Sequence, residues 1–198
     1  MKKAVYGETA SHSGIAGSYN NIGNAYNSLG DYGVALEYHT KSLDMMKAVY
    51  GETASHSGIA GSYNNIGNAY NSLGDYGVAL EYHTKSLDMK KAVYGETNSH
   101  SDIADSYNNV GNAYHSLGDY TAALEYHTKS LDMKKAVYGE TASHSGIAGS
   151  YNNIGNAYNS LGDYGVALEY HTKSLDMMKA VYGETASHSG IAGRYNNI

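Results

Sequence analysis

Apolar side chains recur along this chain at the spacing of a helix that has one buried face. Ile15, Tyr19, Ile22, Tyr26 and Leu29 follow one another at intervals of four, three, four and three residues. This spacing places all five side chains on one side of an amphipathic helix. The polar residues between them, many of them asparagines, lie on the other side.

A second helix of the same kind follows after a short break. Its mainly apolar face recurs at intervals of four and three residues through Tyr32, Leu36, His39, Leu43, Met46 and Tyr50. In the break, Gly30 suits the left-handed residue just past a helix end, and Asp31 suits the N-cap of the next helix. The second helix is predicted to end near Gly51. The polar stretch "ETASHS" leads into each first helix, with Ser11 or Ser13 as the expected N-cap.

The whole chain is built from one unit of 44 residues. The hexapeptide "AVYGET" begins at Ala4, Ala48, Ala92, Ala136 and Ala180. Four full units are followed by a partial one, with the bounds 1–44, 45–88, 89–132, 133–176 and 177–198. We expect residues 1–198 to form a single array, and this array to be a fragment of a longer one.

Each unit is predicted to form a helical hairpin. We name the first helix of a unit helix A and the second helix B. A single hairpin cannot bury both of its faces, so neighbouring hairpins must stack. The pattern therefore predicts an all-α fold, an α-solenoid of stacked antiparallel hairpins.

The third unit departs most from the others. The first and fourth units are identical at all 44 positions, whereas the third differs from the first at seven. These seven residues are Asn98, Asp102, Asp105, Val110, His115, Thr121 and Ala122. Three of the changes are polar and fall on the predicted surface of helix A.

The residues of each hairpin resemble the tetratricopeptide repeat. That family's pattern asks for large, small, aromatic and turn-glycine residues at fixed spacing. Its matches in the first unit, in order, are Tyr19, Ile22, Gly23, Tyr26, Gly30, Tyr32 and Ala35. The resemblance covers all units and implies a right-handed solenoid that acts as a protein-interaction scaffold.

Late helix B departs from the usual tetratricopeptide pattern. His39 stands where an aromatic residue is usual, and Ser42 stands where alanine is usual. The lengthened helix B resembles repeats of the kinesin light chain and nephrocystin type. The segments "YNNIGNAY" and "LEYHTKSL" also resemble repeats of the G-protein-signalling modulator, so the subfamily stays open.

Composition narrows the classes of function. The formal net charge is −6, which argues against a general nucleic-acid binder. Proline is absent. Cysteine is absent as well, so the chain offers neither a disulfide framework nor a thiolate metal site. No run approaches the roughly 20 apolar residues of a membrane span. These features favour a cytoplasmic protein that works without a membrane or nucleic-acid partner.

Asparagines follow the polar side of helix A in every full unit. A primary amide offers two donors and accepts through its oxygen, so a row of amides can bond the backbone of an extended peptide. In related tetratricopeptide domains, asparagines at the positions of Asn21 and Asn24 contact bound peptide. The candidates are Asn20, Asn21, Asn24, Asn27, Asn64, Asn65, Asn68, Asn71, Asn108, Asn109, Asn112, Asn152, Asn153, Asn156 and Asn159. The alternative is that these amides join neighbouring A helices or are simply solvated.

The third unit changes this asparagine stripe most. Asp105 replaces the Gly17 equivalent and His115 replaces the Asn27 equivalent. We count both as candidate peptide-binding residues that give the groove a local acidic preference; neutral drift is the alternative. No Lys or Arg lies between Gly14 and Leu36, so the carboxylate clamp of some related domains is not expected. Only Arg194, near the end, adds a cation to a helix A.

The histidines do not point to a metal site. Copies of one helical position in stacked hairpins lie roughly 10 Å apart, whereas zinc needs ligands at about 2 Å from one point. We expect His39 to pack in the seam between helices and His12 to belong to the turn between repeats. Most tyrosines are expected in the core and the seams.

The leading hypothesis is a non-enzymatic scaffold that binds an extended peptide and needs no cofactor. Identical Ser and His copies at intervals of 44 residues favour a scaffold over one active site. The alternative is a structural or self-assembling spacer that associates end to end through the partial unit 177–198, which lacks its helix B and would expose Tyr195 and Ile198.

Overall fold

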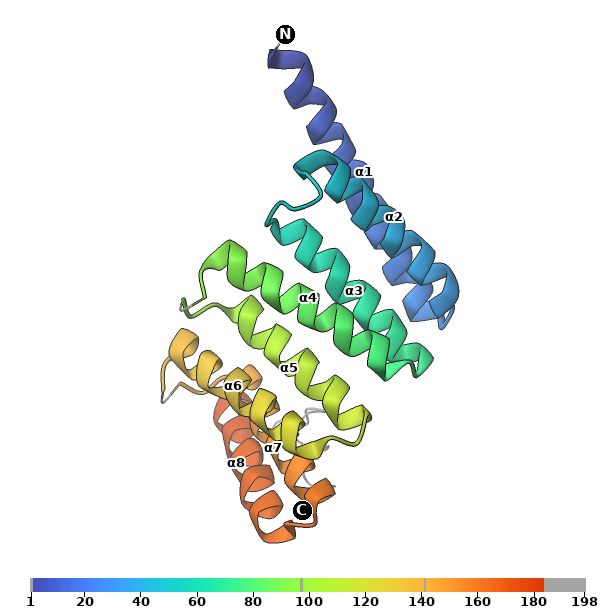
Figure 1. Ribbon diagram of the computed structural model, residues 1–198. Coiled ribbons are helices and arrows are strands. Elements are labelled where there is room, and N and C mark those ends of the chain that lie inside the picture. The colour runs from blue at the N-terminus through green and yellow to red at the C-terminus, as the bar shows by residue number, and fades with distance from the viewer. Residues whose placement is uncertain (1, 97, 141, 184–198) are drawn as a thin grey trace. The chain divides into compact units, whose positions relative to one another are not determined.

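The computed structural model describes residues 2–96, 98–140 and 142–183, and this part of the chain is almost entirely helical (Figure 1). Its eight helices are α1 (Lys2–Leu29), α2 (Tyr32–Tyr50), α3 (Ser57–Leu73), α4 (Tyr76–Tyr94), α5 (Ser101–Ser116), α6 (Tyr120–Tyr138), α7 (Ser145–Leu161) and α8 (Tyr164–Tyr182). No strand occurs among these residues. The predicted all-α class is therefore confirmed.

The chain divides into two compact units, Met1–Thr97 and Asn98–Ile198. In the first, α1 pairs with α2 and α3 with α4, and α2 packs on α3. In the second, α5 pairs with α6 and α7 with α8, and α6 packs on α7. Helix B of one hairpin thus packs on helix A of the next within each unit, which is the predicted repeat stacking. The single array over 1–198 stays a prediction.

The turn inside each hairpin has the predicted chemistry. Gly30 has φ 80°, a left-handed conformation that favours glycine, and Asp31 caps α2 by accepting a hydrogen bond from the Val34 amide. The same arrangement recurs at the turns before α4, α6 and α8. Helix B ends at Tyr50, with Gly51 at φ 105°, so its predicted end near Gly51 is confirmed.

The cap of helix A is a histidine, and the prediction of a serine cap was wrong. The Nδ1 atom of His56 accepts a hydrogen bond from the Gly58 amide at 3.0 Å, and α3 begins at Ser57. The His56 ring also stacks on Tyr50 at the end of the preceding helix B, with ring centroids 3.6 Å apart. His100 and His144 cap α5 and α7 through the same atom. A serine hydroxyl could cap the helix but could not stack on the tyrosine.

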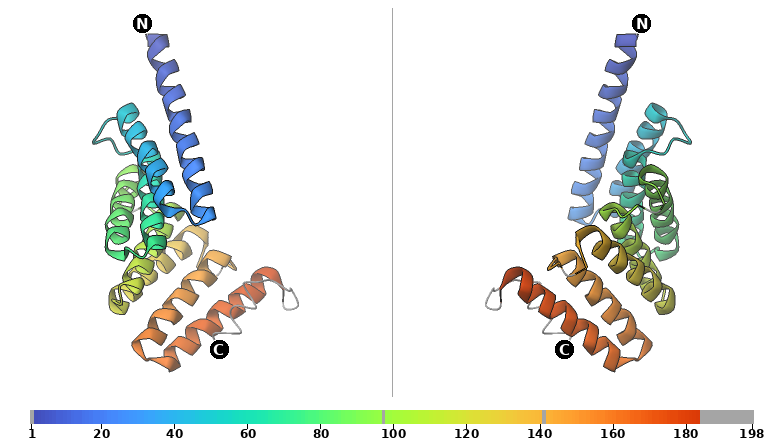
Figure 2. Two further views of the ribbon diagram at one scale, coloured as in Figure 1. Left: turned by 90° about the vertical axis from the view of Figure 1, so that its right-hand side faces the viewer. Right: turned by 90° about the vertical axis from the view of Figure 1, so that its left-hand side faces the viewer.

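The first repeat lacks the loop that was predicted before its helix A. Helix α1 is continuous from Lys2 to Leu29, and its first turns extend past the ends of α2 and α3 (Figures 1 and 2). His12 therefore lies within a helix, not in a turn as predicted. The equivalent segments before α3, α5 and α7 do form loops, each with its stacked or capping histidine.

Apolar side chains fill the seam between hairpins. In the first unit, Ile59 and Ile66 of α3 are buried against Leu43 of α2. In the second unit, Ile147 and Ile154 of α7 pack on Leu131 of α6. The tyrosines of helices A and B are half-buried around these clusters, as predicted from their spacing. The helix face identified from the sequence is therefore the core face in α3 and α7, whereas in α1 its residues Ile15 and Ile22 are exposed.

Two polar residues of helix B are buried against helix A of the same hairpin. The Ser42 hydroxyl donates to the Ala16 carbonyl oxygen at 2.8 Å, and Ser86, Ser130 and Ser174 repeat this bond in their hairpins. This bond explains why serine stands where the family usually has alanine. His39 is fully buried and lies over Gly23, which confirms its predicted place in the seam.

Glycine is required where helix A passes the histidine ring. A Cβ atom on Gly67 would lie 2.8 Å from atoms of the His83 ring, and Gly23, Gly111 and Gly155 face their histidines as closely. A Cβ atom on Gly61, six residues earlier in α3, would meet nothing within 4 Å. The two glycines of α3 therefore have different roles. Gly67 makes room for the His83 ring, whereas Gly61 only lowers the stability of the helix.

We predict opposite effects from one substitution at these two glycines. Gly67→Ala should lower the free energy of unfolding by about 1–3 kcal/mol because its methyl group overpacks the His83 ring. Gly61→Ala should raise it by about 0.5–1 kcal/mol because alanine is the better helix former. Urea unfolding followed by circular dichroism measures both changes, and equal effects of the two variants would contradict this packing.

Candidate peptide-binding surface

The asparagines of helix A fall into two rows with different surroundings. In the first row, Asn24, Asn68 and Asn112 are exposed and Asn156 is half-buried. One turn further on, Ser28, Ser72 and Ser116 are exposed as well. The serines were not singled out from the sequence, although a step of four residues from Asn24 finds them. These side chains form the open side of each helix A, which we name the outer row.

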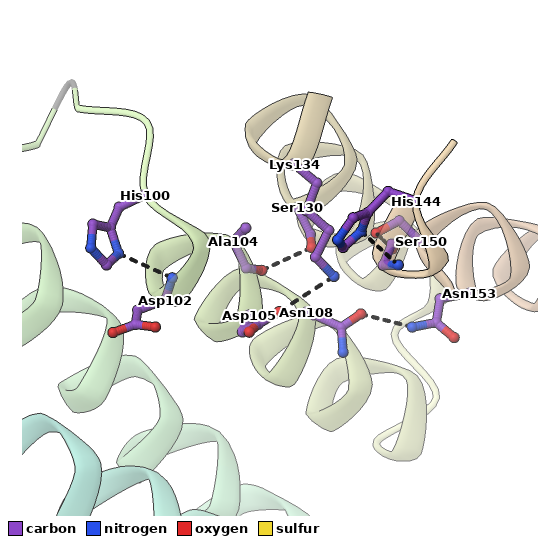
Figure 3. A network of polar contacts seen from close by, with 11 residues as sticks. His100, Asp102, Ala104, Asp105, Asn108, Ser130, Lys134, His144, Ser150 and Asn153 are labelled. Carbon is purple, nitrogen blue, oxygen red and sulfur yellow. Dashed lines mark hydrogen bonds and ion pairs between the residues drawn. The ribbon is translucent and has the colours of Figure 1, made fainter. Parts of the chain in front are cut away.

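The second row joins neighbouring A helices. The Nδ2 group of Asn65 on α3 donates to Oδ1 of Asn20 on α1 at 2.6 Å. In the other unit, Nδ2 of Asn153 on α7 donates to Oδ1 of Asn108 on α5 at 2.7 Å (Figure 3). We name these four residues the seam row. For these four residues the structure therefore shows the alternative to peptide binding, in which the amides join neighbouring A helices.

A buried histidine continues the seam row into the hairpin. The distance from Nδ1 of His39 to Oδ1 of Asn20 is 3.1 Å. Asn20 thus lies between a ring on its own hairpin and an amide on the next one. The Oδ1 atom of Asn20 can accept both bonds, because a carbonyl oxygen has two lone pairs.

The remaining candidate asparagines lie around the two rows. Asn21 is exposed on α1, which has no neighbour on that side among the described helices. Asn64, Asn109 and Asn152 are half-buried, and each makes an interaction within the structure. Asn27 and Asn71 are half-buried with their Oδ1 atoms covered, and Asn159 is exposed. No ligand is present against any of them, so their part in peptide binding stays a prediction.

The two changed candidates of the third repeat both have partners on neighbouring helices. The carboxylate of Asp105 lies 3.4 Å from the ammonium group of Lys134 on α6. The Nε2 atom of His115 lies 3.1 Å from the Ser160 hydroxyl on α7, and its ring contacts Tyr120. Asp105 remains exposed despite its ion pair, so its side chain is open to water on one side.

Tyrosines and lysines contact one another along the edge between helices A and B. In the first hairpin, Tyr38 stacks on Tyr26 with ring centroids 5.7 Å apart, and the Lys41 ammonium lies 4.7 Å from the Tyr38 centroid. The same cation–π contact is made by Lys85, Lys129 and Lys173. The lysines of helix B are thus engaged on this edge. Arg194, the cation noted on the last helix A, lies outside the described residues.

No cluster of metal-ligating side chains accompanies the asparagine rows among the described residues. In the part of the chain that the structure describes, no three His, Asp or Glu side chains converge as metal ligands do. None of the described helices has an apolar stretch long enough to cross a membrane. The A helices present mainly amides and hydroxyls, joined on α5 by the exposed carboxylate of Asp105.

Sequence comparison identifies the family. A sequence profile of the tetratricopeptide repeat matches residues 14–92, 58–136 and 102–180, which overlap along most of the chain. The chain belongs to the tetratricopeptide repeat family. No curated protein sequence matches it.

Several solved structures share the fold. BtubC (BKLC) from P. vanneervenii superposes with a TM-score of 0.75 at 21% identity, covering 87% of this chain and 66% of that one. A Podosopora anserina protein described as a kinesin light chain with nearly identical TPR-like repeats gives 0.74 at 19% identity, covering 94% and 84%. The apo form of RapI gives 0.69 at 17% identity, covering 91% and 67%. At these identities the likenesses show the fold, and one of the three proteins is itself described by nearly identical TPR-like repeats.

The buried histidines make the stability of this tetratricopeptide array depend on pH. Burial lowers the pKa of His39, and it lowers the pKa of His83 and of His127 to about 4. The charge of Lys90 adds to the effect at His83, and the charges of His115 and Lys134 add to it at His127. The folded state therefore holds these rings neutral, while the unfolded chain protonates them below about pH 6.5.

We predict that stability is full above pH 6.5 and falls as the pH drops toward 4, because the unfolded state then binds more protons. Between pH 7.5 and 5.5, His83 and His127 should each contribute a loss of about 1 kcal/mol. Thermal unfolding across this range measures the loss, and a His83→Gln/His127→Gln variant serves as the control with a weaker dependence. A melting temperature that stays flat from pH 7.5 to 5.5 would contradict the burial of neutral imidazoles.

Proposed function

We propose that this chain is a non-enzymatic scaffold that binds an extended peptide segment along the outer row of its A helices. The observation that carries the proposal is the division of the asparagines. One row is committed to bonds between helices, and the other, with Asn24, Asn68 and Asn112, is exposed.

The seam row supports the proposal by holding the two A helices of each compact unit in register. The Asn20–Asn65 and Asn108–Asn153 bonds join the helices that carry the outer row. A peptide would then meet amides whose positions are set before it binds, which lowers the ordering cost of binding. Primary amides both donate and accept, so they suit a peptide backbone whatever its side chains.

The chemistry of the outer row favours a neutral or basic segment that binds away from its own C-terminus. The A helices between Gly14 and Leu29 and their repeats up to 161 carry neither Lys nor Arg, and the net charge of the chain is −6. A free carboxylate would find no cation on this surface. We assign the scaffold to the cytoplasm, since a fold without disulfide bonds needs no oxidising compartment.

The first test selects peptides from a random display library on the immobilised array and measures the affinity of the best binder. Changing Asn24, Asn68, Asn112 and Asn156 together to Ala should weaken that affinity at least tenfold. A matched control changes the exposed helix B residues Asp44, Asp88, Asp132 and Asp176 to Ala and should leave it within twofold. Equal loss in both variants, or no binder above background, would overturn the proposal.

A second candidate function, self-assembly, rests on a specific observation about the helix faces. Ile15 and Ile22 of α1 are 40% and 39% exposed, whereas the equivalent Ile59 and Ile66 of α3 are 0% and 2% exposed beneath α2. Helix α8 has the same 19 residues as α2, and its Leu168 is 47% exposed. The surface that a second copy would cover is therefore the face of α1 that carries Ile15 and Ile22; on α8, Leu175 and Met178 are already buried within the chain, whereas Leu168 stays open.

Light scattering across a concentration series tests this second function. Self-assembly predicts a mass that rises with concentration, and Ile22→Glu should abolish the rise because it places a charge on the docking face. Asn24→Glu, on the open side of the same helix, is the matched control and should leave the association unchanged. A monomer at every concentration would rule out end-to-end assembly of this chain.

A further inference from the structure

Because the hairpins are nearly identical, their sequences leave open which helix A pairs with which helix B. The helix A segments Ser57–Leu73 and Ser145–Leu161 are identical, and so are helices α2 and α8. Any helix A thus offers nearly the same face to any helix B. Apolar packing alone does not distinguish the correct partner from the helix one repeat away.

One position near the end of helix B differs between hairpins and contacts the neighbouring A helices. It is occupied by Met46, Lys90, Lys134 and Met178 in successive repeats. Met46 packs over Gly58 at the start of the next helix A, its sulfur 3.0 Å from where a Cβ atom would stand. Lys134 is only 8% exposed, and its stem lies 3.7 Å from the corresponding point of Gly146 on α7. The lysine therefore buries its stem where other repeats bury a methionine.

The charge of Lys134 is paired with a carboxylate on helix A of its own hairpin. Its ammonium group lies 3.4 Å from the carboxylate of Asp105 on α5 (Figure 3). At the Asp105 position the A helices α1, α3 and α7 have Gly17, Gly61 and Gly149. Lys90 stands with Gly61, so lysine alone does not mark a hairpin. The acid and the lysine occur together only in the hairpin of α5 and α6.

We propose that the Asp105–Lys134 ion pair specifies the pairing of α5 with α6 among hairpins that are otherwise interchangeable. If α6 took α7 as the helix A of its hairpin, Lys134 would lie opposite Gly149. If α5 took α8 as its helix B, Asp105 would lie opposite Met178. Both exchanges separate the largely buried Lys134 ammonium group from the Asp105 carboxylate, which is unfavourable, although the exposure of Asp105 to water limits the cost. Asp105, which replaces glycine in the third repeat, thus helps to select the partner of α5 in addition to being exposed to water.

A double-mutant cycle measures the pairing in the full chain. Asp105→Asn removes the charge and should lower the melting temperature by about 3–6 °C, since Lys134 then lacks its partner. Lys134→Met should cost less, because methionine fits this site in α2 and α8. In the background of Lys134→Met, Asp105→Asn should have almost no effect. Additive effects of the two changes would overturn the proposal.

Refolding separates specification from simple stability. The variant Asp105→Gly/Lys134→Met reproduces the Gly–Met combination of α7 and α8 and should melt at or above the wild-type temperature. It should nevertheless refold from urea with a lower yield of monomer and more slow-folding or oligomeric species. A monomer yield equal to that of the wild type would overturn the proposed role in pairing.

Transplanting the pair into the last described hairpin gives an independent check. Met178→Lys alone should lower the melting temperature, because it buries an ammonium group opposite Gly149. Adding Gly149→Asp should restore most of the loss, as the ion pair is recreated. Failure of the second change to restore stability would show that the pair is not transferable and would count against the proposal.

Discussion

The close approach of helix A to helix B within each hairpin is the constraint on which the other features depend. A histidine ring fills the space over a glycine, and a serine hydroxyl bonds the carbonyl of an alanine about two turns earlier in helix A. The histidine contact leaves no room for a Cβ atom on helix A. Because both contacts recur in every hairpin, the two helices meet in the same way each time. This fixed geometry sets where the polar side of helix A lies.

The fixed geometry also explains why one stripe of asparagines divides into two rows. Asn20 and Asn108 are turned toward the next helix A, where Asn65 and Asn153 meet them. Asn24 and Asn112, one turn later on the same helices, are exposed. Asparagine suits both places because its amide can satisfy a neighbouring helix or a ligand backbone. A helix former such as alanine could do neither.

Much of the fold followed from the residues themselves. The helix faces, the Gly30 and Asp31 turn and the end of helix B near Gly51 were all predictable, since they depend on local spacing and backbone preference. The N-cap was not, because His56 is chosen for its stacking on Tyr50, a contact across a loop that serine spacing cannot indicate. The continuous α1 also escaped prediction: the same "ETASHS" segment is helical there and a loop in the later repeats.

The candidate site was predictable in outline and not in detail. Periodicity identified the asparagine stripe, but adjacent positions such as Asn64 and Asn65 differ by only 100° around a helix, and which one meets the next hairpin depends on packing. The partner of Asp105 was hidden for a similar reason, because Lys134 is 29 residues away and belongs to a position that is methionine elsewhere. Long-range pairing of this kind leaves no mark in one helix alone.

The distinction between the two asparagine rows is the central claim, and side-chain amide hydrogen exchange tests it most directly. Nuclear magnetic resonance with single-site variants for assignment can follow the Nδ2 protons of each asparagine. The account predicts slow exchange at Asn65 and Asn153, which donate across the seam, and fast exchange at Asn24, Asn68 and Asn112. Equal exchange rates in the two rows would contradict it.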